Sequence, residues 1–467
     1  MSRRSYFGIA AAVLGAVVLV VGSQRSLMAQ RQGGPANPAA GLFGPDPAIP
    51  KSPTAVALPA FKEVTGPGPM YESGPAQWPG FDMKHFNYEE KEYFVSGTAA
   101  GEPYAVRLII RKPSNIARFS GIVVAEPMHP IGGAHAFEYN SVYLMDLGHI
   151  AAEISTTGLN NFTGFNAERY KTLAVTNAQS NEVLAQVGAL VRSGNGPLAV
   201  LTVRKMVLWG TSASSGIVAR YLPASPIYKT PQMGRIYDGF MPTSNGSQIN
   251  PVDVPIIQVP TQREFMQVAT SQQDGDEPGK QFRVYEFPGM PHLPARNNPR
   301  FTDADCTHPR DMFPIEAYMS VALNYLIQWV DKGVAPPRAE RVYMDMYVGN
   351  DGSLMMLDEV GNAKGGIRNP YVDVPVNKII LPNEGKGPAP DLTRLQPGQL
   401  PVMGPSLLCS LSGWDQPLSA VQLKKRYGTK ENFVKQFEAK LNEAEKAGWS
   451  LPVYHQLILG DAKAVTF

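Results

Sequence analysis

The residues best suited to covalent chemistry lie in the segment GTSASSG (210–216), which holds three serines. The segment follows the apolar run KMVLW (205–209), typical of a strand, and precedes a run typical of a helix. A sharp turn from strand to helix presents a serine as a nucleophile when the residues two before and two after it are small. Both Ser212 and Ser214 meet this condition. We favour Ser212, because Gly210 ends the apolar run and the turn therefore starts there.

A serine nucleophile on such a turn needs an acid and then a histidine later in the chain. Glu264 lies just beyond the strand-like run VPIIQVP (254–260), and His292 lies just beyond FRVYEFPG (282–289). The carboxylate would hold the imidazole in one tautomer, and the imidazole would act as general base. His292 stands in a Gly-Met-Pro-His loop, away from any periodic apolar face, which favours a catalytic role over a packing role.

Other residues could take the same roles. Asp274 and Asp276 are alternative acids, although they lie in the polar segment QQDGDEPGK, which is typical of a solvated loop. His308 is an alternative base. A serine-rich loop between strand and helix can also serve only as a helix cap, so the order of the partners carries the catalytic hypothesis.

An oxyanion hole requires two hydrogen-bond donors. The first is expected to be the backbone N–H of Ala213, the residue after the nucleophile. The second is expected from the loop in VVAEPMHPIGG (123–133), at Met128 or His129. The two prolines of this loop have no N–H and are excluded as donors.

The elements around these residues indicate an α/β fold. Short apolar runs bounded by Gly or Pro alternate with helical patterns, which is typical of a mainly parallel sheet covered by helices on both faces. The first two runs are close together and predict an antiparallel hairpin at one edge. The expected strands are 92–99, 104–111, 121–127, 148–155, 205–210, 236–242, 254–260 and 282–289, and the expected helices are 177–192, one from about 215, and 314–333. We assign residues 71–335 to this core.

The N-terminal region has the pattern of a targeting segment. Residues 1–29 combine a basic start, an apolar stretch and a small-residue cleavage site after Ala29, as a secretory signal peptide does. We expect a periplasmic or secreted protein with no stable membrane anchor after cleavage. Residues 30–70 are rich in Gly, Pro and Ala and predict a flexible leader or an extended arm. The near balance of 42 Lys and Arg with 40 Asp and Glu argues against a nucleic-acid partner.

Residues 336–467 form a C-terminal extension. The segment 429–450 has a helical pattern with an apolar stripe, which indicates packing on the core; a partner surface is the alternative. The stripe consists of Phe433, Phe437, Leu441 and Ala444. The only cysteines, Cys306 and Cys409, could form a disulfide or remain separate thiols. No Cys or His cluster has metal-ligand spacing, so we predict neither a metal nor an organic cofactor.

The sequence resembles the bacterial "alpha/beta hydrolase domain" family of exported, largely uncharacterised proteins. The matching motifs extend along nearly the whole mature chain and include EYFVSGTA, IRKPSNIARFSGIVVAE, GTSASSG, YDGFMP, VPIIQV, GNAKGGIRNPYVDVP and LCSLSGWDQP. The resemblance implies an α/β-hydrolase fold and a serine hydrolase in which Ser212, Glu264 and His292 match the family's serine, acid and base. The chain departs from the family pattern in three places: Ala213 stands for the usual Gln, EPMHP for Glu-x-x-Asn, and TQRE for an acidic pair.

The expected function is hydrolysis of a carboxylic ester or lactone through an acyl-enzyme. The substrate would be a small ester or a polymer. One alternative is a catalytically inactive, hydrolase-like periplasmic binding protein, and another is a hydrolase of amides or polymers. The sequence does not indicate an oligomeric state.

Overall fold

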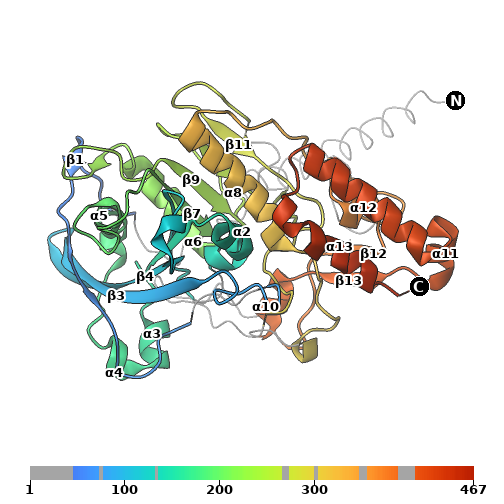
Figure 1. Cartoon of the computed structure of the whole chain (residues 1–467), viewed down its shortest axis with the longest axis horizontal. Helices are drawn as coiled ribbons and strands as arrows, with labels where there is room; N and C mark the ends of the chain where they lie inside the picture. The colour runs from blue at the N-terminus through green and yellow to red at the C-terminus, as the bar shows by residue number, and fades with distance from the viewer. Residues whose placement is uncertain are drawn as a thin grey trace, which may run out of the picture.

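The computed structural model describes residues 46–72, 77–131, 135–265, 273–298, 303–345, 355–387 and 405–466. A twisted sheet forms the centre of the molecule, and the C-terminal helices lie together on one side of it (Figure 1). The predicted signal peptide (1–29) and the first part of the predicted leader lie outside the described residues.

The main sheet has nine strands. Six neighbouring strands, from β11 to β6, run parallel, and β4, β3 and β2 continue the sheet in antiparallel order. From one edge to the other the strands are β11 (Phe282–Val284), β10 (Ile256–Gln258), β9 (Gly239–Thr243), β7 (Lys205–Thr211), β5 (Ile122–Pro127), β6 (Ile150–Ile154), β4 (Glu102–Pro113), β3 (Tyr88–Ala99) and β2 (Ala60–Glu63). The predicted α/β architecture and the antiparallel hairpin are confirmed. Because parallel strands end at a common edge, the loops after β5, β7, β10 and β11 can meet there.

Helices cover both faces of the sheet and bury an apolar core on each. On one face, α5 (Ser180–Arg192) and α6 (Ala213–Tyr221) pack against the sheet. On the other face lie α2 (Ser141–Asp146) and α8 (Ile315–Lys332). No helix among the described residues, α8 included, is long and apolar enough to cross a membrane.

The C-terminal extension packs onto the face that α8 covers. The apolar stripe predicted for residues 429–450 is buried on α12 (Lys430–Lys446), next to α13 (His455–Ala464) and α11 (Ala420–Tyr427). Figure 1 shows α12 and α13 in red beside α8. This stripe therefore belongs to the interior of the molecule. The remaining elements are α3 (Asn160–Phe165), α4 (Ala167–Tyr170), α9 (Pro370–Asp373), α10 (Pro405–Leu411), β12 (Asn377–Ile380) and β13 (Trp414–Pro417).

Part of the predicted flexible leader is an ordered arm. Within residues 46–70, β1 (Thr54–Ala55) pairs with β8 (Tyr228–Lys229), and β2 pairs with β3 at the sheet edge. The prediction of a flexible leader is wrong for these residues, and the alternative of an extended arm holds. Its composition is rich in Gly and Pro, but the backbone N–H and C=O groups of an extended segment can still pair with an open strand edge.

The two cysteines are joined. Cys306 and Cys409 form a disulfide with their Cα atoms 5.5 Å apart, although they lie 103 positions apart in the sequence. The bridge connects the loop that follows His292 to α10 of the extension. On the same side, the Leu293 N–H donates a 3.1 Å hydrogen bond to the Leu411 carbonyl. The extension is thus tied to the loop that carries the candidate base.

We expect the Cys306→Ser/Cys409→Ser double variant to be less stable than the wild type by at most about 4–5 kcal/mol, since the closed loop is long and its closure restricts the unfolded chain. Urea unfolding followed by tryptophan fluorescence measures this difference. The reduced wild type should behave as the double variant does. An unchanged free energy of unfolding in both samples would contradict the expectation.

Candidate active site

Ser212 lies at the turn between β7 and α6. Its backbone has φ 54° and ψ −121°, a conformation that non-glycine residues rarely adopt and that costs free energy. The residues on either side of it are buried, whereas Ser212 is half-buried and accessible. A strained, accessible serine between a strand and a helix is the geometry of a nucleophile elbow.

Gly210 explains why the turn can be this sharp. A Cβ atom at Gly210 would lie 2.4 Å from the Ser214 carbonyl oxygen and 2.7 Å from Cγ2 of Val218. Both contacts are far inside van der Waals distance, and the first is with the backbone of α6. The requirement for a small residue two positions before Ser212 therefore comes from the close approach of strand and helix.

We expect Gly210→Ala to destabilise the protein by about 1–3 kcal/mol and to displace Ser212, because α6 must shift to admit the methyl group. Gly460→Ala is the matched control: a Cβ at Gly460 meets no atom within 4 Å, and alanine favours the interior of α13. Chemical unfolding and labelling by a serine-reactive fluorophosphonate would test both variants. Full labelling of Gly210→Ala at wild-type stability would contradict this explanation.

The other two serines of the turn face inward. Ser214 is fully buried; its Oγ accepts a 2.8 Å hydrogen bond from the Thr211 N–H and donates one of 2.9 Å to the Thr211 carbonyl. Ser215 is also fully buried. Ser214 thus closes the turn from beneath, as the favoured register predicts, and Ser212 presents its hydroxyl at the surface of the site.

Three side chains from three separate loops form a hydrogen-bonded chain. Oγ of Ser212 lies 2.7 Å from Nε2 of His292, and Nδ1 of His292 lies 2.8 Å from Oε1 of Glu264. The three residues follow β7, β10 and β11, whose carboxyl ends share one edge of the sheet. The structure therefore brings together the three residues that the sequence nominated.

The charge of Glu264 determines the direction of these hydrogen bonds. Burial raises the pKa of Glu264, but the charge of His292 and hydrogen bonds from His292 and Thr261 outweigh it and hold the pKa below its usual value. Glu264 is then a carboxylate and can only accept, so His292 donates from Nδ1. In the neutral form of His292, the Nε2 atom is then left to accept the hydrogen bond from the Ser212 hydroxyl, as a general base must.

The alternative acids and base are occupied elsewhere. Asp274 accepts a 3.1 Å hydrogen bond from the Val284 N–H, and Asp276 pairs with Arg283 and Arg338. The His308 ring stacks on Trp414 with a centroid distance of 3.8 Å. None of these three residues takes part in the hydrogen-bonded chain of Ser212.

Supporting residues that the sequence did not single out hold the acid and base in place. Thr261 donates to Oε2 of Glu264 from its backbone N–H at 2.9 Å and from its hydroxyl. Gln262 accepts a 2.7 Å hydrogen bond from the Gly289 N–H, and its own N–H donates to the Met290 carbonyl. The Tyr139 hydroxyl donates to the His292 carbonyl at 3.3 Å. A Thr three residues before a Glu is a local turn signal that could have identified Thr261.

Of the predicted oxyanion donors, Ala213 has a backbone N–H with no acceptor in its helix, whereas the N–H of Met128 is used within the sheet. Ala213 is the first residue of α6, so its N–H has no acceptor within the helix. The Met128 N–H donates a 2.8 Å hydrogen bond to the Ile154 carbonyl, which extends the pairing of β5 with β6. Met128 therefore cannot serve as the predicted second donor, because its N–H is already used by the sheet. His129, which is buried, remains the predicted donor of this loop.

A family comparison decides the class of this fold. The family model described as "Alpha/beta hydrolase domain" matches residues 60–459. The chain belongs to this family. The α/β-hydrolase fold implied by the sequence resemblance is thereby confirmed, and membership supports hydrolase activity. A search among curated proteins finds no match to the chain.

Several solved hydrolases are distantly similar to the chain. A cold-adapted esterase from an Arctic intertidal metagenomic library shares 14% identity over 45% of this chain and 88% of its own, with a TM-score of 0.26. A glucuronoyl esterase from Solibacter usitatus shares 9% identity over 53% of this chain and 86% of its own, with a TM-score of 0.28. A poly(3-hydroxybutyrate) depolymerase from Bordetella parapertussis shares 10% identity over 55% of this chain and 92% of its own, with a TM-score of 0.30.

Among the described residues, no group of three or more His, Cys, Asp or Glu side chains is arranged to hold a metal ion.

Proposed function

We propose that this member of the family is a serine hydrolase that cleaves a carboxylic ester or lactone. The observation that carries the proposal is the hydrogen-bonded chain Ser212–His292–Glu264, with its serine accessible at a strained turn. A buried cap serine would need neither the strain nor a histidine at 2.7 Å.

The reaction follows from these contacts. Nε2 of His292 takes the proton as Oγ of Ser212 attacks the carbonyl carbon, and Glu264 stabilises the imidazolium that forms. The backbone N–H groups of Ala213 and His129 would donate hydrogen bonds to the carbonyl oxygen and stabilise its negative charge. His292 then protonates the leaving alcohol, and a water molecule, activated by the same imidazole, hydrolyses the acyl-enzyme.

A fluorophosphonate probe and a panel of acyl substrates test the proposal. We expect labelling on Ser212 and faster turnover of esters than of matched amides, since an alkoxide leaves more readily than an amide anion. A protein that resists the probe and binds esters without turnover would instead be the inactive binding protein. Preferred turnover of amides would move the proposal to that substrate class.

We further propose that the enzyme is exported. The basis is the signal-peptide pattern of residues 1–29, which belongs to the sequence alone. Intact-mass measurement on protein secreted by its native host should show a chain that begins at or near Gln30. A mass that retains the first 29 residues would refute export with cleavage.

A further inference from the structure

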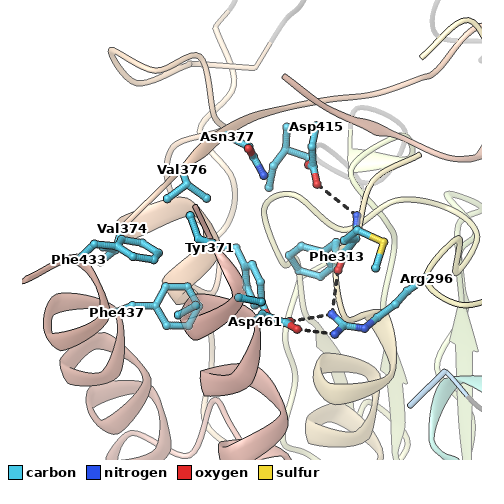
Figure 2. A pocket seen from close by; sticks show the side chains of 15 residues that line it. Arg296, Phe313, Tyr371, Val374, Val376, Asn377, Asp415, Phe433, Phe437 and Asp461 are labelled. Carbon is cyan, nitrogen blue, oxygen red and sulfur yellow. Dashed lines mark hydrogen bonds and ion pairs between the residues drawn. The ribbon is translucent and has the colours of Figure 1, made fainter. Parts of the chain in front are cut away.

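A cavity lies where the extension meets the hydrolase core. Its volume is about 310 Å³, and Figure 2 shows the side chains that line it. The walls come from α9, β12, α12 and α13 of the extension and from the segment that leads into α8. Ser212, His292 and Glu264 are not among the lining residues. Met312 lines the cavity and is 47% exposed, so the cavity reaches the surface.

Most of the wall is apolar. Phe433 and Phe437 of α12 face Phe313, and valine and isoleucine side chains from β12 and its approach complete the lining (Figure 2). One water molecule occupies about 30 Å³ in the liquid, so the cavity has room for roughly ten non-hydrogen atoms. A small aromatic or aliphatic body fits this space and would gain from burial.

The polar groups at one end of the cavity already satisfy one another. Asp461 accepts hydrogen bonds from Nη1 of Arg296 at 2.7 Å and from the Tyr371 hydroxyl at 2.6 Å, and Nη2 of Arg296 completes a two-point ion pair. The Arg296 guanidinium also stacks over the Trp78 ring at 4.0 Å. This end therefore offers no free cation to an anionic ligand.

Asp415, on β13, lines the other part of the cavity and has no cationic partner within the described part of the chain. Its Oδ2 accepts a 3.2 Å hydrogen bond from the Met312 N–H, as the dashed line in Figure 2 shows. The nearby Asp311 carboxyl accepts hydrogen bonds from the Phe313 and Gly413 N–H groups and forms no ion pair among the described residues. Burial and the charge of Asp415 raise the pKa of Asp311 to about 7, so it adds a second negative group at pH 8. Burial raises the pKa of Asp415 to about 6, which still leaves it charged at pH 8.

We propose that this cavity binds a small amphiphilic molecule with an apolar body and one protonated amine, the amine pairing with Asp415. The aromatic and aliphatic walls recognise the body, and the uncompensated carboxylate recognises the charge. A wholly apolar ligand would leave the carboxylate further desolvated, and an anion would be repelled by it. Because its walls come from both core and extension, a bound ligand would also stabilise their contact.

Isothermal calorimetry at pH 8 with 2-phenylethylamine and its neutral counterpart 2-phenylethanol tests the proposal on the full, disulfide-bonded chain. We expect the amine to bind more tightly than the alcohol by on the order of tenfold or more, since a charge-assisted hydrogen bond is made only by the amine. Asp415→Asn keeps an acceptor for the Met312 N–H and should remove this preference. Asp253→Asn, in a surface ion pair with Arg235, is the matched control and should retain it.

A second variant keeps the test independent of how Asp415→Asn folds. Val376→Trp places a large side chain in the cavity and should weaken binding of amine and alcohol alike. Equal affinity for the two probes, no binding of the amine at millimolar concentration, or an amine preference that survives Asp415→Asn would each overturn the proposal. The measurement involves no turnover, so its failure would leave the proposed role of Ser212 intact.

Discussion

Ser212→Ala should abolish labelling by the fluorophosphonate probe and lower kcat by roughly 10⁶-fold, as loss of a serine nucleophile does. The expectation rests on the 2.7 Å contact between its Oγ and Nε2 of His292, and on its accessibility at the turn. His292→Ala should produce a defect of similar size, because nucleophile and base act as one unit. Residual turnover would report transition-state binding by the oxyanion donors alone. Mass spectrometry of the adduct and steady-state kinetics on a preferred ester measure both effects.

The neighbouring serines supply the controls for this experiment. Ser215→Ala removes a buried hydroxyl for which no hydrogen-bond partner is found among the described residues, so it should leave labelling and kcat near the wild-type values. Ser214→Ala should cost stability, since it removes two hydrogen bonds to Thr211, but the remaining folded protein should label on Ser212. A covalent adduct on Ser212→Ala together with none on Ser214→Ala would mean that the register of the turn is wrong.

The positions of most strands along the chain and the triad candidates could be predicted because local signals and chain order coincide. The runs before the three candidates are short and apolar, with Gly210, Pro260 and Gly289 at or near their ends, and Ser212, Glu264 and His292 follow them. Since such strands end at one edge, residues just beyond 211, 260 and 289 had to lie near one another. Gly210 at the end of the apolar run favoured Ser212 over Ser214, and the structure gives the physical reason, because a Cβ at Gly210 would collide with α6.

Other features depend on tertiary pairing that no local pattern specifies. Nothing in the sequence excluded the Met128 N–H as an oxyanion donor. The pairing of β5 with β6 extends one residue beyond the apolar run, however, and this N–H donates to the Ile154 carbonyl. The composition of the leader arm predicts a flexible segment, yet β1 pairs with the edge of β8 and β2 with the edge of β3. Gln262 acts across two loops, joining the acid turn to the Gly289–Met290 turn, and such a contact has no signature in sequence spacing.

Glu264→Gln should lower kcat by roughly 10⁴-fold at neutral pH, less than the loss of Ser212, because the serine and the base remain. The amide can still fill the space and meet Thr261, but it cannot stabilise the imidazolium. Its NH₂ group can also face Nδ1 of His292 and favour the wrong tautomer. Asp274→Asn is the matched control, since Asp274 bonds the Val284 N–H instead of His292, and it should keep wild-type turnover. The opposite pattern would make Asp274 the acid.

The lowered pKa of Glu264 also predicts how the stabilities of the wild type and of Glu264→Gln depend on pH. Burial opposes this lowering, and the His292 charge with the hydrogen bonds from His292 and Thr261 outweighs it, so the folded-state pKa lies below the usual 4.5. A carboxyl group of this kind stabilises the folded protein above its unfolded pKa, and that contribution is lost as the pH falls through the folded value. The stability advantage of the wild type over Glu264→Gln should therefore be full at neutral pH and shrink only below pH 4.5. Urea unfolding of both proteins at neutral pH and at two values below 4.5 measures the difference. An advantage that grows as the pH falls would show that Glu264 is protonated, and not a carboxylate, beside His292.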